Sequence, residues 1–228
     1  MFPARIIPLI AAGLLPVGGC GPKPETPRTI PAVTIPADPP QASTPSVPQQ
    51  TRPIEPMGPS ERLAAAAADQ VGKTAVYDPS YVKLAYPGGD VPMDRGVCCD
   101  VVVRALRKMG GDLQVLIHED MKGAFDQYPK IWGLKRPDPN IDHRRVPNIA
   151  AYFQRKGKAV PVTRVPSDYR PGDIVAWKLK GGRPHIGVVS NTMAAGTRRY
   201  QMVHNIGAGT QLEDVLFAYE ITGHFRYF

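Results

Sequence analysis

Two adjacent cysteines, Cys98 and Cys99, begin a segment whose side chains follow a helical period. Apolar residues recur at intervals of one, three, four and seven positions, at Val101, Val102, Ala105, Leu106 and Met109. A cysteine in the first turn of a helix lies against backbone amides with partial positive charge, and this favours the thiolate over the thiol. Because the thiolate is the nucleophilic form, the segment predicts a reactive cysteine that needs a basic side chain as its partner.

Two histidines could supply that base. His185 begins the apolar run "HIGVVS", and His204 lies in the next such run, "MVHNIG". Side chains on the same face of paired strands approach to about 5 Å, so we expect His185 to act as the base and His204 to orient its ring. Asn205 is the alternative orienting residue, because strand alternation lets only one of His204 and Asn205 face the site.

A zinc site is the competing interpretation of the titratable residues. Its ligands would come from the two strand histidines and from two polar segments, at His118, Glu119, Asp120, Asp142 and His143. Zinc ligands usually follow a fixed spacing, which these residues lack, and adjacent residues on a helix point in different directions. We therefore expect neither a metal nor another cofactor.

Three arginines, Arg136, Arg144 and Arg145, belong to the proline-containing stretch "KRPDPNIDHRR". Arginine binds carboxylates through two parallel hydrogen bonds, so we expect these side chains to bind an acidic group of a substrate. A solvated basic surface is the alternative.

The order of the elements predicts an α+β domain. Helices are expected from Ser60, which can cap the first of them, to Gly72, and over residues 113–128 and 146–156. Residues 74–96, rich in Tyr, Pro, Gly and Asp, form a long loop that we expect to shape the site. Short runs of Val, Ile, Tyr and Phe then predict antiparallel strands. We therefore expect N-terminal helices packed on an antiparallel sheet.

The cysteine at the helix start is followed along the chain by "PGDIV", "HIGVV" and "VHN". This order resembles the NlpC-type cell-wall cysteine peptidases, which are papain-like. The resemblance implies a papain-like fold with a cysteine nucleophile, His185 as the base and His204 as the orienting residue. It also implies a tyrosine, followed by Gly-Gly, that assists at the oxyanion site, and Tyr86, twelve residues before Cys98, matches it.

Residues 60–228 are more closely similar to a bacterial family of unknown function within this superfamily. The similarity rests on "YDPSYVKLAYPGGDVPMDRGVC" and "KRPDPNIDHRRVPN". In that family threonine commonly stands at the second cysteine position, which implies that Cys98 is the nucleophile and Cys99 a packed helix residue. The Asp-Cys-Ser-Gly usual in NlpC-type enzymes is replaced here by Val97-Cys98-Cys99-Asp100.

The N-terminal quarter of the chain carries targeting and spacing signals. Residues 1–20 combine Arg5, a short apolar run and the ending "VGGC", which predicts a lipoprotein signal peptide with a lipidated Cys20. An ordinary signal peptide cut nearby is the alternative. Residues 21–59, dense in Pro, Thr, Ser and Gln, predict a disordered tether, and residues 60–228 form the expected hydrolase domain.

Charge and export narrow the function. The chain has a formal net charge of +8, a moderate basic excess that suits an anionic wall or membrane surface. No aromatic and basic motif points to nucleic acid. We expect a monomeric, periplasmic, membrane-anchored cysteine amidase or endopeptidase that cleaves amide bonds of peptidoglycan peptides. A non-catalytic module that binds the wall or a protein, and an acyltransferase that acts on lipids, are the alternatives.

Overall fold

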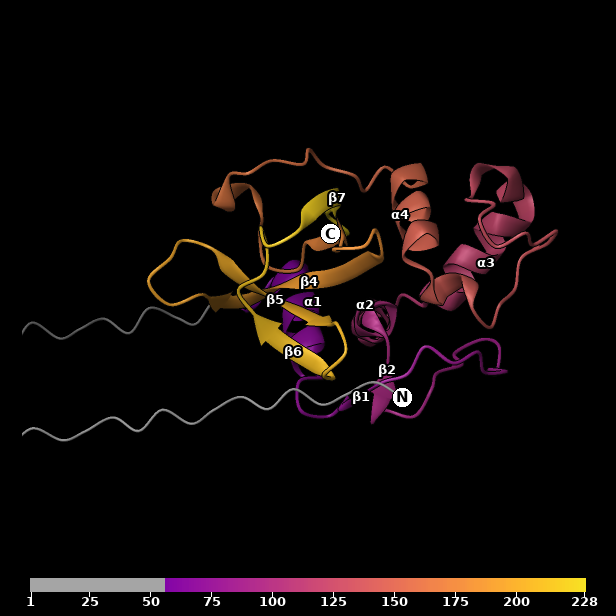
Figure 1. The fold of residues 1–228 in the computed structure, drawn as a ribbon, viewed down its shortest axis with the longest axis horizontal. Helices are drawn as coiled ribbons and strands as arrows, with labels where there is room; N and C mark the ends of the chain where they lie inside the picture. Colours follow the sequence, from indigo (N-terminus) through magenta and orange to yellow (C-terminus); the bar gives the residue numbers. More distant parts are fainter. Residues whose placement is uncertain (1–55) are drawn as a thin grey trace, which may run out of the picture. The chain divides into compact units, whose positions relative to one another are not determined.

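The computed structural model describes residues 56–228, so the predicted signal peptide, the lipidation site Cys20 and most of the predicted tether lie outside it. The described part is an α+β domain in which α-helices pack against one face of a five-stranded antiparallel sheet (Figure 1). This arrangement confirms the expected fold class.

The helices lie where the sequence predicts them, with shifted ends. Their bounds are α1 Pro59–Ala68, α2 Cys98–Lys108, α3 Leu113–Ala124 and α4 Val146–Arg155, with 3-10 turns at Phe125–Gln127, Asp142–Arg144 and Pro166–Asp168. The predicted cap of the first helix is wrong, because Pro59 starts α1 with Gly58 before it and Ser60 is already helical. Gly72 lies in a turn beyond the end of α1. No helix within residues 56–228 is long and apolar enough to cross a membrane.

The five-stranded sheet has the strand order β6-β5-β4-β3-β7, with every neighbouring pair antiparallel. Its strands are β3 Ile174–Lys178, β4 Pro184–Met193, β5 Tyr200–Asn205, β6 Thr210–Glu213 and β7 Glu220–Phe225. Strand β6 was not expected, since its sequence "TQLE" holds a single large apolar residue. Two further short strands, β1 Val76–Tyr77 and β2 Arg95–Gly96, pair in parallel inside the predicted loop.

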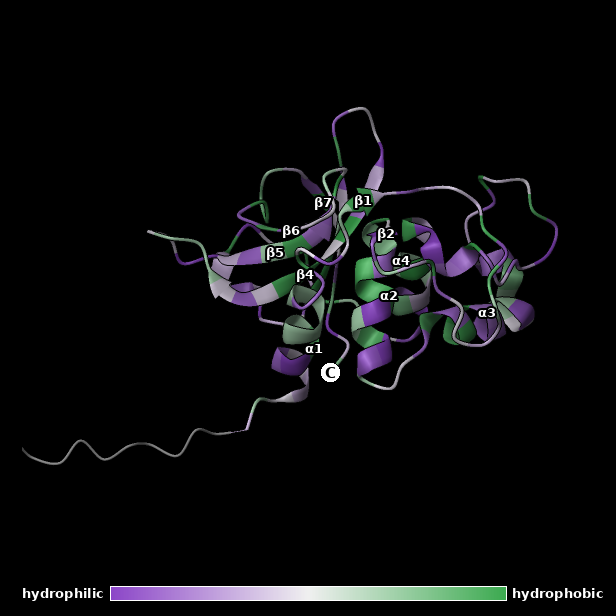
Figure 2. Ribbon diagram, turned by 90° about the horizontal axis from the view of Figure 1, so that it is seen from below, coloured by the Kyte–Doolittle hydropathy of each residue, from purple (hydrophilic) through white to green (hydrophobic). Residues whose placement is uncertain are grey.

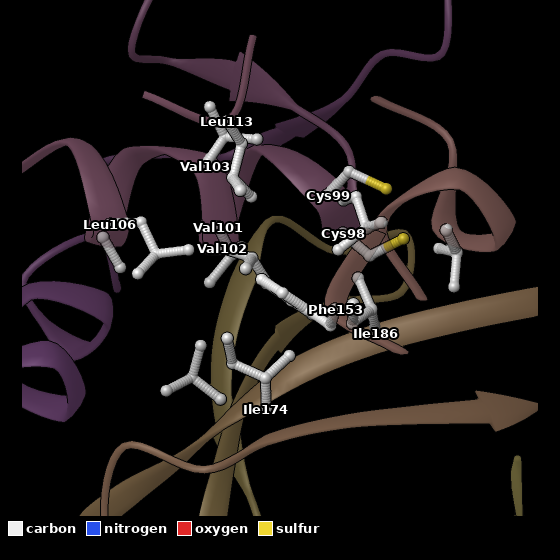
Figure 3. Packing of buried hydrophobic residues seen from close by; sticks show 14 of the residues in the cluster. Cys98, Cys99, Val101, Val102, Val103, Leu106, Leu113, Phe153, Ile174 and Ile186 are labelled. Carbon is white, nitrogen blue, oxygen red and sulfur yellow. The ribbon is translucent and has the colours of Figure 1, made fainter. Parts of the chain in front are cut away.

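The two faces of the sheet have separate cores. One face packs against the helices and carries Ile174, Ala176, Ile186, Val188 and Val203. The other face carries Val175, Trp177, Val189 and Met202 under Tyr169 and Leu216. Helix α2 lies at the centre of the first core, and Figure 2 shows hydrophobic residues concentrated on it. The tight packing of α2 on the sheet therefore fixes the position of its first turn, where the two cysteines lie (Figure 3).

Candidate active site

Cys98 is the first residue of α2 and is 5% exposed. The turn before it is closed by Asp100, whose Oδ2 accepts a hydrogen bond of 2.7 Å from the Val97 amide. The Asp100 amide donates to the Val97 carbonyl at 3.0 Å. The amides of Cys98 and Cys99 precede it in the first turn, where no carbonyl of the helix can reach them, so they can donate to a ligand beside the thiol. Figure 3 shows that the sulfur atoms of Cys98 and Cys99 project from this turn toward the same side.

The two neighbouring thiols have opposite acidity. A hydrogen bond from the Cys99 thiol is the largest cause that lowers the pKa of Cys98 to about 5. The side chain of His185 and the backbone amide of Ile186 lower it further, while burial opposes them. Burial and the adjacent Cys98 raise the pKa of Cys99 well above its usual value. The opposite directions of the two shifts favour Cys98 over Cys99 as the thiolate.

A pocket of about 370 Å³, here called the thiol pocket, opens beside the two cysteines. Its walls come from the loop before α2, from the segment around Trp132 and Ile141, from the first turn of α4 and from the start of β4 at Pro184. Its volume lies within the range of pockets that bind small molecules. A substrate group of modest size can therefore reach the thiolate.

The structure brings His185 and His204 together. His185 Nε2 lies 2.9 Å from His204 Nδ1, and the rings meet edge to face. The contact is diagonal, because His204 is paired directly with Gly187 rather than with His185. A Cβ at Gly187 would lie 3.0 Å from the His204 Cβ and 2.8 Å from the carbonyl oxygen of Val203. The lack of a side chain at Gly187 thus lets the two rings meet across the sheet.

His204 is held as a neutral ring. Burial, followed by the neighbouring His185, lowers the pKa of His204 to about 4. Glu213 Oε2 lies 2.9 Å from His204 Nε2, but outside the alignment of a hydrogen bond. Trp177 stacks on the His185 ring with centroids 5.7 Å apart, and its indole N–H donates to the Leu216 carbonyl. The His185 ring is therefore fixed on one side by Trp177 and at one nitrogen by the His204 ring.

Asn205, the alternative orienting residue, does not meet His185. Its side-chain amide donates to the Gly96 carbonyl at 3.1 Å and is fully buried. Gly96 ends β2, two residues before Cys98. Asn205 therefore connects the end of β5 to the segment that leads into the turn of Cys98.

Tyr86 does not lie at the thiol, contrary to the expectation from the resemblance. Its hydroxyl donates to Glu119 Oε1 at 2.8 Å. The nearby Gly88 amide donates to Asp112, which follows the C-terminal end of α2. Cys98 begins that helix, whose 11 residues span about 16 Å. The helix length separates Tyr86 from the oxyanion site.

Tyr77 lines the thiol pocket instead. The pairing of β1 with β2 places Tyr77 beside Gly96, and so next to the turn of Cys98. Burial, then the charges of Cys98 and Cys99, raise the pKa of Tyr77 to about 12, so its hydroxyl keeps a proton to donate. Sequence reasoning missed Tyr77, because strands of two residues show no periodic pattern.

Arg144 lines the thiol pocket and also binds the turn that holds Cys98. Its Nε and Nη2 each lie 2.9 Å from an oxygen of Asp100, and both side chains are buried. Removing one partner of such a pair costs about 3–5 kcal/mol, because the other charge stays buried. Arg144 therefore holds Asp100, and with it the turn of Cys98, while its role in substrate binding stays a prediction.

The other two arginines lie in different places. Arg145 lines the thiol pocket, packs over the Trp132 ring at 4.1 Å and pairs with Asp142 at 3.0 Å. Arg136 lines a second cavity on the far side of the same loop. Arg144 and Arg145 therefore both line the thiol pocket, whereas Arg136 does not.

The residues of the zinc alternative are not brought together. Within residues 56–228, no group of three or more His, Cys, Asp or Glu side chains lies close enough to hold a metal. Asp120 binds Arg155 and Lys156, while Asp142 accepts a hydrogen bond from the Asp138 amide. Burial lowers the pKa of His143 to about 4.

Comparisons with known proteins identify the family. The family model described as "Domain of unknown function (DUF1287)" matches residues 64–227. "Uncharacterized protein YijF" of Escherichia coli strain K12 is 58% identical over 167 residues, which make up 73% of this chain and 80% of that protein. A solved structure, NlpC1 from Trichomonas vaginalis, is similar with a TM-score of 0.40 and 15% identity over 77% of this chain; the match covers 46% of NlpC1, less than half of its length. By the family match and the identity to YijF, the chain belongs to the DUF1287 family.

Proposed function

We propose that this protein is an exported cysteine amidase or endopeptidase that cleaves amide bonds in peptidoglycan peptides. The observation that carries the proposal is a helix-terminal thiol of low pKa, Cys98, that interacts with an imidazole pair, His185 and His204, beside a pocket. Acyl transfer by cysteine needs these three parts: a nucleophile, a base and a group that orients the base. The choice of peptidoglycan rests on the resemblance of the motifs to NlpC-type peptidases and on the predicted export.

In the first half of the reaction, the Cys98 thiolate attacks the amide carbonyl carbon. The first-turn amides of α2 and the Tyr77 hydroxyl can donate to the oxyanion that forms. Protonated His185 gives its proton to the leaving amine as the carbon–nitrogen bond breaks, which leaves a thioester on Cys98. In the second half, neutral His185 takes a proton from water, the hydroxide attacks the thioester, and the thiolate leaves.

His204 supports both halves without changing its own charge. Its Nδ1 accepts a hydrogen bond from His185 Nε2, which keeps that N–H pointing away from the thiol. The other nitrogen of His185 is then free to carry the proton that moves between Cys98, the amine and water. His204 is in this sense an orienting residue, comparable in role to the third member of other catalytic triads.

The proposal is tested by incubating the purified protein with disaccharide-peptide muropeptides and identifying the products by mass spectrometry. We expect wild type to release new fragments, Cys98→Ala to release none, and Cys99→Ser, the matched neighbouring change, to retain cleavage. Absence of cleavage by wild type, or cleavage by Cys98→Ala, would contradict the proposal. A thiol that resists iodoacetamide near neutral pH would favour a binding module, and turnover of acyl lipids alone would favour the acyltransferase.

Export and lipidation form a separate part of the proposal, because Cys20 lies outside the described residues. A lipid on Cys20 would hold the protein at a membrane, with residues 21–59 as the tether. Cell fractionation of wild type and Cys20→Ala should show the variant in the soluble fraction. The mass of the mature N-terminus should also include the added acyl chains. An unmodified N-terminus would favour an ordinary signal peptide.

A further inference from the structure

A larger cavity of about 940 Å³, here called the loop pocket, is lined by the loop that follows Trp132. It is lined by Tyr81, His118 and residues 133–140. At two places, consecutive residues of the chain line different pockets. Trp132 and Ile141 line the thiol pocket, and their neighbours at positions 133 and 140 line the loop pocket. The loop between these points therefore borders both pockets, which makes them candidates for two groups of one extended substrate.

The loop pocket is held in a defined shape by hydrogen bonds. The Tyr81 hydroxyl donates to Asp138 at 3.1 Å, and the Asn140 amide donates to the same carboxylate at 2.9 Å. Asn140 Oδ1 accepts from the Leu84 amide at 2.8 Å, and the Gln114 side chain donates to the carbonyl of residue 139. A site built in advance in this way does not spend binding energy on ordering its own loop.

The charged side chains that line the loop pocket are Lys135, Arg136 and Asp138, so its net charge is positive. Lys135 and Arg136 are exposed, and neither forms an ion pair with any residue between 56 and 228. The Asp138 carboxylate is already used by Tyr81 and Asn140. His118 Nδ1 is buried at the wall with no hydrogen-bond partner in the described chain.

The two arginines that line the thiol pocket, in contrast, have ion-pair partners. Arg144 is paired with Asp100, and Arg145 is paired with Asp142. Cations that already have carboxylate partners add little attraction for another anion, whereas unpaired ones attract it fully. An acidic group of a substrate is therefore favoured in the loop pocket, away from the thiolate, which would itself repel a second negative charge.

We propose that the loop pocket is a second subsite of the substrate of Cys98, in which Arg136 and Lys135 bind a peptide carboxylate remote from the cleaved amide. This inference rests on the proposed function and names the substrate class more closely, as peptides with a free carboxylate beyond the scissile bond. The guanidinium of Arg136 matches a carboxylate in two parallel hydrogen bonds. Binding energy from this remote group places the amide at the thiolate.

The test compares two disaccharide-tetrapeptide muropeptides that differ only in whether the peptide carboxylates are free or amidated. Calorimetric titration into full-length Cys98→Ala protein should give a Kd about 10-fold weaker for the amidated peptide, as expected for one lost charged hydrogen-bonding pair. Adding Arg136→Gln should weaken binding of the free-carboxylate peptide about 10-fold and leave the amidated peptide unchanged. In cleaving protein, Arg136→Gln should raise KM and leave kcat nearly constant.

Arg198→Gln is the matched control. Arg198 is an exposed arginine in the turn between β4 and β5, far along the chain from both pockets, and its loss should not change either Kd. Equal binding of the two peptides, or an equal effect of Arg136→Gln on both, overturns the subsite. Carboxylate-dependent binding without cleavage by wild type would overturn the proposed function alone, whereas cleavage without carboxylate dependence would overturn the subsite alone.

Discussion

Two buried imidazoles on the same sheet, His185 in β4 and His224 in β7, have opposite kinds of partner. His224 Nε2 lies 2.8 Å from Asp173, and its Nδ1 lies 3.0 Å from the Pro161 carbonyl. Asp173 is also bound by Arg226 through Nε at 2.8 Å and Nη2 at 2.7 Å. His185 instead meets the neutral ring of His204 on one side and the Cys98 thiol on the other.

The difference shows what separates a structural imidazole from a reactive one. Burial favours a neutral carboxyl, yet hydrogen bonds from His224 and Arg226 lower the pKa of Asp173 below its usual value. In the His224 cluster, both nitrogens of the ring and both oxygens of Asp173 thus have hydrogen-bond partners. The pKa of His204 is lowered to about 4 by burial and by His185, so His185 has a neutral neighbour in place of a carboxylate. The same side chain joins strands in one place and can transfer protons in the other.

The largest expected effect comes from removing the base. His185→Gln should lower kcat/KM by about 10³-fold, or roughly 4 kcal/mol, because proton transfer to the leaving amine is lost. His224→Gln is the matched change on the same sheet and should alter kcat/KM by less than about threefold per folded molecule, since it touches no reacting atom. Steady-state kinetics on a muropeptide substrate measure both. Similar losses of kcat/KM in the two variants would contradict a catalytic role for His185 that His224 does not share.

The second effect concerns stability rather than rate. Asp173→Asn should lower the free energy of unfolding by about 3 kcal/mol, because it leaves the charge of Arg226 without its buried partner. Urea denaturation followed by circular dichroism measures this loss. In the absence of urea, and at a temperature at which the variant is folded, Asp173→Asn should retain cleavage activity. A variant as stable as wild type would show that the cluster is not a structural ion pair.

The acid side of the stability profile tests the same cluster. The pKa of Asp173 is lowered in the folded state, so its contribution is present above the ordinary value of 3.8 and is lost as the pH falls through the folded pKa. Wild type should therefore lose more stability than Asp173→Asn between about pH 5 and pH 3. Urea midpoints at several pH values give the two slopes. If stability falls with pH equally in wild type and Asp173→Asn, the loss of stability in acid comes from other carboxylates.

A smaller effect is expected at the orienting ring. His204→Phe should lower kcat by about 100-fold, because His185 then lacks the acceptor that fixes its Nε2–H. His204→Gln keeps a polar acceptor and should recover part of the rate. The pH profile of kcat separates this from a packing effect, since only a loss of orientation changes the apparent pKa of the base. Equal kcat in the two variants would favour packing.

The placement of Cys98, His185 and His204 was largely predictable, because these residues belong to regular elements. The helical period placed Cys98 at the start of α2, and the apolar runs placed His185 and His204 on paired strands. Periodicity carries such information when an element is long enough to repeat. The diagonal register and the need for Gly187 between the rings depend on strand pairing, which no single run of residues specifies.

The parts that were missed depend on contacts between distant segments. Tyr77 reaches the thiol through a two-residue strand, and Tyr86, which matched by spacing, is bound to α3 instead. Arg144 pairs with Asp100 across 44 residues of sequence. Charge and residue type could not predict which of the three arginines is buried in an ion pair. Burial and ion pairing depend on how the loop folds against α2.

The smallest expected effect concerns the two adjacent cysteines, since Cys99 is the largest cause that lowers the pKa of Cys98. Cys99→Ala should raise the pKa of Cys98 by about one unit, or roughly 1.4 kcal/mol, because the thiolate loses a hydrogen bond. Cys99→Ser removes the same sulfur but keeps a donor, so the pKa should stay close to that of wild type. The rate of iodoacetamide labelling against pH, followed on the peptide that contains Cys98, gives all three values. Because alanine and serine are both smaller than cysteine, a packing role for Cys99 predicts equal shifts, whereas a donor role predicts a shift in the alanine variant alone.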